Sequence, residues 1–283
     1  MDYNDNLFSE KTRLVANEID VKYGDNKIID CLNIEIPTAK ITILIGANGC
    51  GKSTLLKSMA RVLTPSSGSV WLDGKDIHKS NTKQVAKKLG LLPQGPVAPE
   101  GLTVKELVSQ GRFPHQSLLR QWSSKDETAV NNAMALAKVD IFADLQVDDL
   151  SGGQRQRCWV AMAMAQETDI ILLDEPTTFL DLKIQVELMD LLSTLAHENG
   201  RTLVVVLHEL NLAAAYADNL IMIKDGKIVF KGEPNKIFTS DNLKFVFDLN
   251  ADILIDPSTN RHICIPKYKN ATSFSQSTEG AST

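Results

Sequence analysis

The sequence contains few cysteines, and they are not spaced like metal-binding or redox pairs. The four are Cys31, Cys50, Cys158 and Cys264, and the 283-residue chain has no CxxC motif. Zinc and thioredoxin-like sites therefore have no support in the sequence, and a reducing, intracellular compartment is the expected one.

Long apolar runs are also missing. No stretch approaches the roughly 20 apolar residues that a bilayer span needs. The first residues, MDYNDNLFSEKTR, lack the basic start and apolar centre of a signal peptide. We therefore expect a chain without a membrane span of its own, although such a chain can still sit on a membrane protein.

The sequence has no surplus of basic residues. Lysine and arginine number 30 against 35 acidic residues, which gives a net charge of -5. Proteins that bind nucleic acid through electrostatics usually present a basic face, so we expect no nucleic-acid partner. Hydrophobic residues make up 43% of the chain, which is enough for a substantial core.

Apolar runs and amphipathic segments alternate along the chain. KITILIG (40–46), DIILLD (169–174) and TLVVVLH (202–208) are typical of strands buried on both faces of a parallel sheet. The apolar residues of 181–199 recur with helical spacing. This pattern predicts an α/β fold with a mostly parallel sheet.

Two other regions predict additions to that core. An antiparallel β-subdomain is expected before residue 40, turning at Gly24-Asp25-Asn26, and a hairpin is expected to turn at Asp225-Gly226. Residues 95–150 show no strand pattern. Two capping boxes, at Thr103–Glu106 and Ser124–Glu127, predict an inserted helical subdomain there.

The two ends of the sequence differ from the rest. Residues 1–12 are expected to form a flexible arm. The Ser/Thr-rich residues 268–283 are expected to form a disordered tail, which leaves one domain over 13–267.

A phosphate-binding loop is the most specific motif. GANGCGKST follows the 40–46 strand and precedes a helical stretch, as G-x-x-x-x-G-K-[ST] requires. Glycines let backbone N–H groups close on phosphate oxygens, Lys52 places a positive charge beside the β- and γ-phosphates, and Ser53 offers a hydroxyl to Mg²⁺. The predicted nucleotide-binding residues are Gly46, Asn48, Gly49, Cys50, Gly51, Lys52, Ser53 and Thr54.

Cys50 lies inside this loop and allows two interpretations. It is a small residue that fits the turn, or its thiolate is stabilised by the start of the helix and is reactive.

Polar residues end three of the expected strands. Asp174 and Glu175 close DIILLD, where Asp174 suits a second Mg²⁺ ligand and Glu175 suits polarisation of the attacking water. Gln94 closes LGLLPQ, where its amide can reach metal and water, and His208 closes TLVVVLH. The carboxyl ends of parallel strands meet at one sheet edge, so these four are expected together. Tyr23, in the N-terminal sheet, could stack on adenine.

A second, incomplete phosphate site appears in LSGGQRQR, residues 150–157. Two glycines follow a serine at the expected start of a helix, which is how helix N-termini bind anions, but there is no lysine.

Over roughly residues 14–250 the sequence resembles the ATP-binding subunits of ABC transporters. Residues 46–54 match Walker A, Gln94 the Q-loop, Leu150 to Gln154 the family signature and 170–175 the Walker B strand with its catalytic glutamate. Further matches are the aromatic adenine platform, the D-loop aspartate and the switch histidine, at Tyr23, Asp181 and His208. Phe179 departs from the Ser-Ala-Leu-Asp found in many members.

The resemblance implies a reason for the missing lysine. In this family the signature of one subunit caps the γ-phosphate held by the Walker A of another. It implies that Ser151, Gly152, Gly153, Gln154 and Asp181 serve a second copy of the chain in a head-to-tail ATP-sandwich homodimer with ATP and Mg²⁺.

Finer similarities are to the importer branch for iron–siderophore, haem and cobalamin uptake, with the ferric-siderophore type foremost. They lie in LLPQ, EGLTVKELVSQGRFPHQ and PTTFLDLKIQVELM. This implies work at the cytoplasmic face of a bacterial inner membrane, with permease subunits and, indirectly, a substrate-binding protein. Residues 99–115 are then expected near the surface that receives a permease coupling helix.

Rival interpretations are an exporter subunit and an ABC ATPase of DNA repair or translation. Repair types usually carry a long coiled coil between Walker A and signature, and translation types usually carry two cassettes. Here about a hundred residues without heptads separate the motifs, and there is one cassette.

Overall fold

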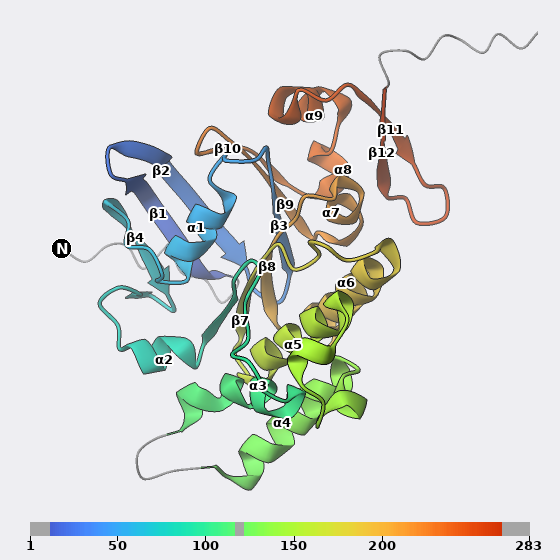
Figure 1. Ribbon diagram of the computed structural model, residues 1–283. Helices are drawn as coiled ribbons and strands as arrows, with labels where there is room; N and C mark the ends of the chain where they lie inside the picture. Colours follow the sequence, from blue (N-terminus) through green and yellow to red (C-terminus); the bar gives the residue numbers. More distant parts are fainter. Residues whose placement is uncertain (1–11, 117–121, 268–283) are drawn as a thin grey trace, which may run out of the picture.

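The computed structural model describes residues 12–116 and 122–267 (Figure 1). The expected arm up to residue 11 and the expected tail from 268 lie outside these ranges, and β1 already begins at Thr12. Among the described residues, no helix is both long and apolar enough to cross a membrane.

A six-stranded sheet forms the centre of the molecule, in the order β10-β9-β3-β8-β7-β6. The five strands from β9 to β6 run parallel to one another, and β10 pairs antiparallel with β9. The strands are β3 (Ile41–Ile45), β6 (Leu89–Leu92), β7 (Ile170–Asp174), β8 (Thr202–Val206), β9 (Asn219–Lys224) and β10 (Lys227–Gly232). The predicted α/β class and the hairpin at Asp225-Gly226 are confirmed.

The central strands are buried on both faces, as their unbroken apolar runs predict. On β3, β7 and β8, apolar residues at odd positions belong to one hydrophobic core and those at even positions to the other. Because successive side chains point to opposite faces of a strand, each strand contributes to both cores.

A second, antiparallel sheet covers one face, in the order β2-β1-β4-β5. Its strands are β1 (Thr12–Tyr23), β2 (Asn26–Pro37), β4 (Ser67–Leu72) and β5 (Lys75–Asp76). Helix α1 (Lys52–Met59) packs between the two sheets, with Leu55, Leu56 and Met59 fully buried. The N-terminal sheet was predicted from residues before 40, but half of its strands come from after the phosphate loop.

Helices cover the opposite core and extend beyond one end of the sheet (Figure 1). They are α3 (Val104–Ser109), α4 (Ser124–Leu136), α5 (Gly152–Ala165), α6 (Leu182–His197) and α7 (Leu210–Tyr216), with 3₁₀ turns η1 (Gln110–His115), η2 (Asp140–Phe142) and η3 (Val147–Asp149). Those between 95 and 150 form the predicted helical insert, although Thr103 also bridges Gln146. The short helix α2 (Thr82–Ala86) instead packs through Val85 into the core that α1 shares with the antiparallel sheet.

One predicted helix cap was wrong by a residue. The capping box of α4 uses Ser123 and Asp126 rather than Ser124 and Glu127. Two overlapping Ser-x-x-acid patterns compete here. Arg112 selects the first, because its guanidinium lies 2.9 Å from the Asp126 carboxylate in a buried ion pair. The box at Thr103 and Glu106 is confirmed.

The C-terminal part adds α8 (Pro234–Ile237), α9 (Ser240–Phe247) and a hairpin of β11 (Ala251–Ile255) and β12 (His262–Pro266). Asn211 of α7 holds this hairpin, since its amide exchanges two hydrogen bonds with the backbone of Cys264. The sequence analysis did not predict the β11–β12 hairpin.

Candidate nucleotide-binding site

The phosphate loop joins the carboxyl end of β3 to the start of α1. Gly51 takes a left-handed φ of 106°, and a Cβ there would lie 2.7 Å from the side chain of Ile29. At Gly46 a Cβ would lie 2.2 Å from the Ile223 carbonyl oxygen. Only glycine fits these two positions, so the loop backbone can wrap closely around an anion.

Lys52 is almost fully buried and held by the loop itself. Its ammonium donates to the carbonyl oxygens of Gly46 at 2.8 Å and Ala47 at 3.1 Å. Backbone carbonyls are weaker partners for an ammonium than phosphate oxygens, which carry full charge. An incoming phosphate can therefore replace these carbonyl oxygens as the partner of the Lys52 ammonium.

The structure favours the packing interpretation of Cys50. Its side chain is buried, and this burial raises the pKa of the thiol, while the positive charge of Lys52 opposes the rise less strongly. A thiol kept protonated by burial is a weak nucleophile.

Asp174 ends β7 with its carboxylate buried and only half satisfied. Ser53 donates to its Oδ1 at 2.8 Å, and its Oδ2 has no hydrogen-bond partner among the residues that the structure describes. Burial raises the pKa of Asp174, with Ser53 acting against the rise. A buried carboxylate oxygen without a hydrogen bond costs free energy unless a cation or a donor binds it. Ser53 and Asp174 together therefore fit a hard metal ion such as Mg²⁺.

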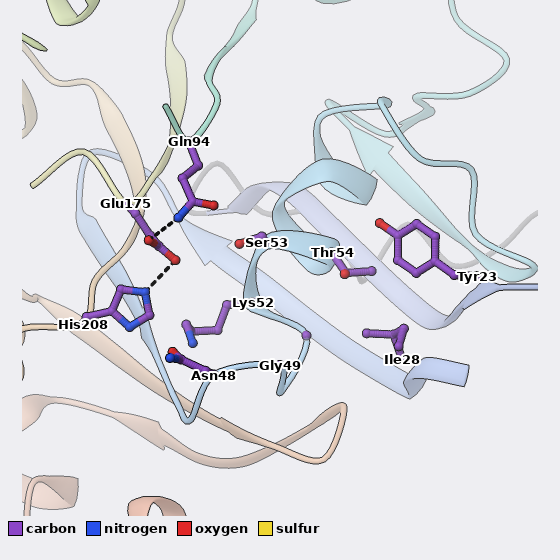
Figure 2. Close-up of a pocket in the computed structure, with 11 residues that line it drawn as sticks. Tyr23, Ile28, Asn48, Gly49, Lys52, Ser53, Thr54, Gln94, Glu175 and His208 are labelled. Atoms are coloured by element: carbon purple, nitrogen blue, oxygen red, sulfur yellow. Dashed lines mark hydrogen bonds and ion pairs between the residues drawn. The ribbon is translucent and has the colours of Figure 1, made fainter. Parts of the chain in front are cut away.

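Glu175 lies at the meeting point of three strand ends. Gln94 donates to its Oε2 at 2.5 Å, and Nε2 of His208 lies 2.5 Å from its Oε1 (Figure 2). Its backbone is left-handed, with a φ of 53°. Such a conformation costs a residue with a side chain about 1–2 kcal/mol and often marks a functional position. Gln94 and His208 come two residues after β6 and β8 end, rather than as their last residues.

These side chains line one pocket of about 440 Å³. Tyr23, half exposed, lies at the end opposite Glu175 and His208, with the phosphate loop between them (Figure 2). An extended ligand can therefore place an aromatic ring near Tyr23 and phosphates near Lys52. The lining residues are Tyr23, Ile28, Asn48, Gly49, Gly51, Lys52, Ser53, Thr54, Gln94, Glu175 and His208.

The signature residues stand apart from this pocket. Ser151 caps α5 in a reciprocal box with Gln154, and both Ser151 and Gly152 are exposed. Asp181 caps α6 and is exposed as well. Gly153 lies against Ile184. Ser151, Gly152, Gly153, Gln154 and Asp181 do not line the pocket of their own chain.

Sequence reasoning missed two features of the site. Ile28 lines the pocket and follows the turn after Tyr23. Its position in the same hairpin as Tyr23 could have predicted this. Glu209, directly after His208, accepts hydrogen bonds from Thr177 and Gln185. No pattern in the sequence pairs residues this far apart.

The chain is similar in sequence and fold to known proteins of one family. The family model described as "ABC transporter" matches residues 29–178. The "Probable siderophore transport system ATP-binding protein YusV" of Bacillus subtilis is 55% identical over 86% of this chain and 89% of its own length. The ferric enterobactin transport ATP-binding protein FepC of Escherichia coli is 46% identical over 94% of this chain and 98% of its own.

Among solved structures, a dimeric structure of MJ0796, a bacterial ABC transporter cassette, superposes with a TM-score of 0.69 at 28% identity. The match covers 78% of this chain and 98% of that one. With the phosphate loop, the strand-end carboxylates and these similarities in agreement, the chain belongs to the ABC transporter family as one of its ATP-binding, ATP-hydrolysing domains.

Proposed function

We propose that this chain is the ATP-hydrolysing subunit that powers import of an iron–siderophore complex through a membrane permease. The observation that carries the cargo assignment is the high identity, over most of both chains, to proteins named for siderophore and ferric enterobactin transport. The pocket supports the ATPase chemistry, which is common to the whole family and does not by itself select a cargo.

The residues divide the chemistry among them. Tyr23 stacks on the base, and Lys52 and the loop N–H groups hold the phosphates. Mg²⁺, held by Ser53 and Asp174, would neutralise charge on the phosphate oxygens. Glu175 accepts a hydrogen bond from the attacking water and polarises it.

Two side chains at the strand ends hold Glu175 for that task, in addition to a hydrogen bond from the Thr178 hydroxyl at 3.3 Å. His208 and Gln94 each bond one oxygen of its carboxylate in the free protein. When nucleotide enters, both side chains are within reach of the water and of the phosphate end of the pocket, where His208 can stabilise charge on the γ-phosphate.

The complete site is proposed to need a second copy of the chain. Ser151 and Gly152 are exposed, and all the signature residues lie outside the pocket of their own chain, as expected if they serve a partner. The N-terminus of α5 supplies N–H groups and the positive end of a 14-residue helix. A head-to-tail homodimer then brings Ser151, Gly152, Gly153 and Gln154 of one copy, with its Asp181, to the ATP of the other.

The energy of such an assembly is set by charge-assisted hydrogen bonds to the triphosphate. Each is worth about 1.5–3 kcal/mol, and several form at each of the two sites. Hydrolysis places repelling charge in the same interface. A cycle of ATP binding and hydrolysis can therefore close and open the dimer with enough energy to bias a two-state permease.

A polar pocket of about 450 Å³ supports a permease contact near residues 99–115. Arg112 and His115 line it from that segment, with Lys87 from the core and Lys125 from α4. It lies between the helical insert and the core, so a helix bound there would contact both. Phe113, 73% exposed in the same segment, adds an apolar contact.

These partners define a location. Bound to a permease, the chain sits at the cytoplasmic face of a bacterial inner membrane, and a substrate-binding protein acts on the far side without contacting it. The similarity of this chain to import ATP-binding proteins supports that placement.

Uptake of radiolabelled iron tests the cargo. Cells lacking the gene should lose uptake of a ferric catecholate or ferric hydroxamate siderophore, and the wild-type gene should restore it while the Glu175→Gln gene does not. Normal siderophore uptake with lost uptake of haem or of cobalamin would contradict the cargo assignment. It would favour haem or cobalamin, whichever is no longer taken up, as the cargo.

A further inference from the structure

We propose that Glu209 is a positioning residue, which ties His208 to the segment 177–181 and so makes the placement of His208 against Glu175 depend on the partner copy. The inference rests on the proposed dimeric function and adds to it the route by which dimer contact reaches the reacting end of the pocket.

The carboxylate of Glu209 joins two elements. Its Oε2 accepts from Oγ1 of Thr177 at 3.0 Å, and its Oε1 accepts from Nε2 of Gln185 at 3.2 Å. The Gln185 amide also donates to the carbonyl oxygens of Leu180 at 3.1 Å and Thr177 at 3.4 Å. Glu209 and Gln185 therefore clamp the segment 177–181 at both of its ends.

The clamp is protected from water on the side of the core. Thr177 is 1% exposed, so its hydroxyl has no solvent to replace the carboxylate. Among the described residues Glu209 forms no ion pair, and its two oxygens are used by this clamp. A buried hydroxyl that loses its acceptor costs about 1–3 kcal/mol, which resists separation of the two elements.

The outer side of the segment faces away from the chain. Phe179 is 99% exposed with a left-handed φ of 64°, and Asp181 is exposed at the cap of α6. A large apolar side chain presented in this way is expensive to leave in water and is suited to contact with another protein. In the proposed dimer the partner copy lies on this side.

The inner side of the segment lies close to the reacting residues in sequence at both ends of the clamp. Thr177 is two residues after Glu175, and Glu209 directly follows His208. Because Nε2 of His208 and Oε1 of Glu175 are only 2.5 Å apart, a small movement of the clamp changes their geometry. Misplacement of a reacting group by about 1 Å can cost about 100-fold in rate.

Steady-state ATPase assays of three variants test the inference. Glu209→Ala should lower kcat by about 10- to 100-fold and leave the KM for ATP within about twofold, since no pocket-lining group is removed. Gln185→Ala should lower kcat in the same direction, and the double variant should be no worse than Glu209→Ala, because both act through one clamp. Glu209→Gln, which keeps an acceptor oxygen, should recover part of the rate.

Tyr216→Phe is the matched control. It removes another hydrogen bond between α7 and α6, from the Tyr216 hydroxyl to Asp190 at 2.7 Å, away from the pocket. It should lower the unfolding midpoint and leave kcat within about twofold. If Glu209→Ala does not fold, Gln185→Ala and Glu209→Gln carry the test.

A second readout separates positioning from assembly. In the Glu175→Gln background, Glu209→Ala should still give an ATP-dependent dimer by gel filtration. A kcat for folded Glu209→Ala within twofold of wild type, or additive losses in the double variant, would overturn the inference while leaving the proposed function intact. A wild-type chain that stays monomeric by gel filtration with ATP and Mg²⁺ and still hydrolyses ATP at the full rate would instead overturn the dimeric function.

Discussion

Ser53 and Asp174 are 121 positions apart in the sequence, yet the serine hydroxyl donates to the aspartate at 2.8 Å. The contact joins the first turn of α1 to the last residue of β7, so the phosphate loop and the carboxylate edge form a single site. Within the described part of the chain the other Asp174 oxygen has no hydrogen-bond partner, and a metal ion would complete this position.

Asp174→Asn should separate stability from activity. Burial raises the pKa of Asp174, so ionisation of this carboxylate destabilises the folded, ligand-free protein at neutral pH. Asparagine can still accept from Ser53 but carries no charge. The variant should have a higher unfolding midpoint at neutral pH and little or no Mg²⁺-dependent hydrolysis.

The pH dependence of that gain has a definite sign. Because the pKa of Asp174 is raised in the folded state, the wild-type protein loses stability as the pH rises from the ordinary carboxyl pKa of 3.8 through the folded pKa. Its stability is therefore recovered as the pH falls back toward 3.8. Thermal melts without nucleotide should show the advantage of Asp174→Asn shrinking on acidification. An advantage that grows on acidification would contradict the assignment.

Glu175→Gln should bind ATP and fail to hydrolyse it. Glutamine keeps the size of the side chain but cannot accept a proton, so hydrolysis should slow by about 100- to 10,000-fold. Trapped ATP should stabilise the dimer, which gel filtration with ATP and Mg²⁺ measures directly. Only monomer under these conditions would count heavily against the proposal.

Lys52→Ala should lose nucleotide binding. Removal of charge-assisted hydrogen bonds to phosphate costs about 1.5–3 kcal/mol, or roughly 10- to 150-fold in affinity. A fluorescent ATP analogue measures this. Lys75→Ala, on the exposed strand β5, is the control for loss of one positive charge. Equal affinities for the two variants would remove the phosphate-loop assignment.

Ser151→Ala should impair hydrolysis more than nucleotide binding by the isolated chain, because in the proposed dimer the serine acts on the partner's ATP. The change also removes a helix cap worth about 1 kcal/mol. Ser123→Ala removes the same kind of capping box from α4 and is therefore the control for stability. Similar ATPase rates in the two variants would mean that Ser151 matters for hydrolysis because it caps the helix, and not because it contacts phosphate.

Local patterns predicted most of the fold, because they depend on neighbouring residues. The buried strands β3, β7 and β8 follow from unbroken apolar runs, and the strand-end residues Asp174 and Glu175 follow from the strands. The start of α4 could not be predicted from local patterns, because two serines offered equivalent caps. The ion pair of Asp126 with the distant Arg112 decided between them.

Features that depend on contacts between residues far apart in the sequence could not be predicted from sequence patterns. The β11–β12 hairpin depends on Asn211 bonding the backbone of Cys264, and no local pattern records that contact. The same holds for the clamp of Glu209 on Thr177. Periodicity reports which face of an element is buried, but not which element covers it.

Complementation between two inactive variants tests the central claim most directly. If each ATP lies between the phosphate loop of one copy and the signature of the other, Lys52→Ala and Ser151→Ala fail alone but form one intact site when mixed. Random pairing gives half heterodimers with one of two sites intact, or up to about a quarter of the wild-type rate. Lys52→Ala mixed with Glu175→Gln is the control, because both defects lie in the same half-site and cannot complement. Activity restored only in the first mixture is the predicted result, and no gain in either mixture would contradict the account.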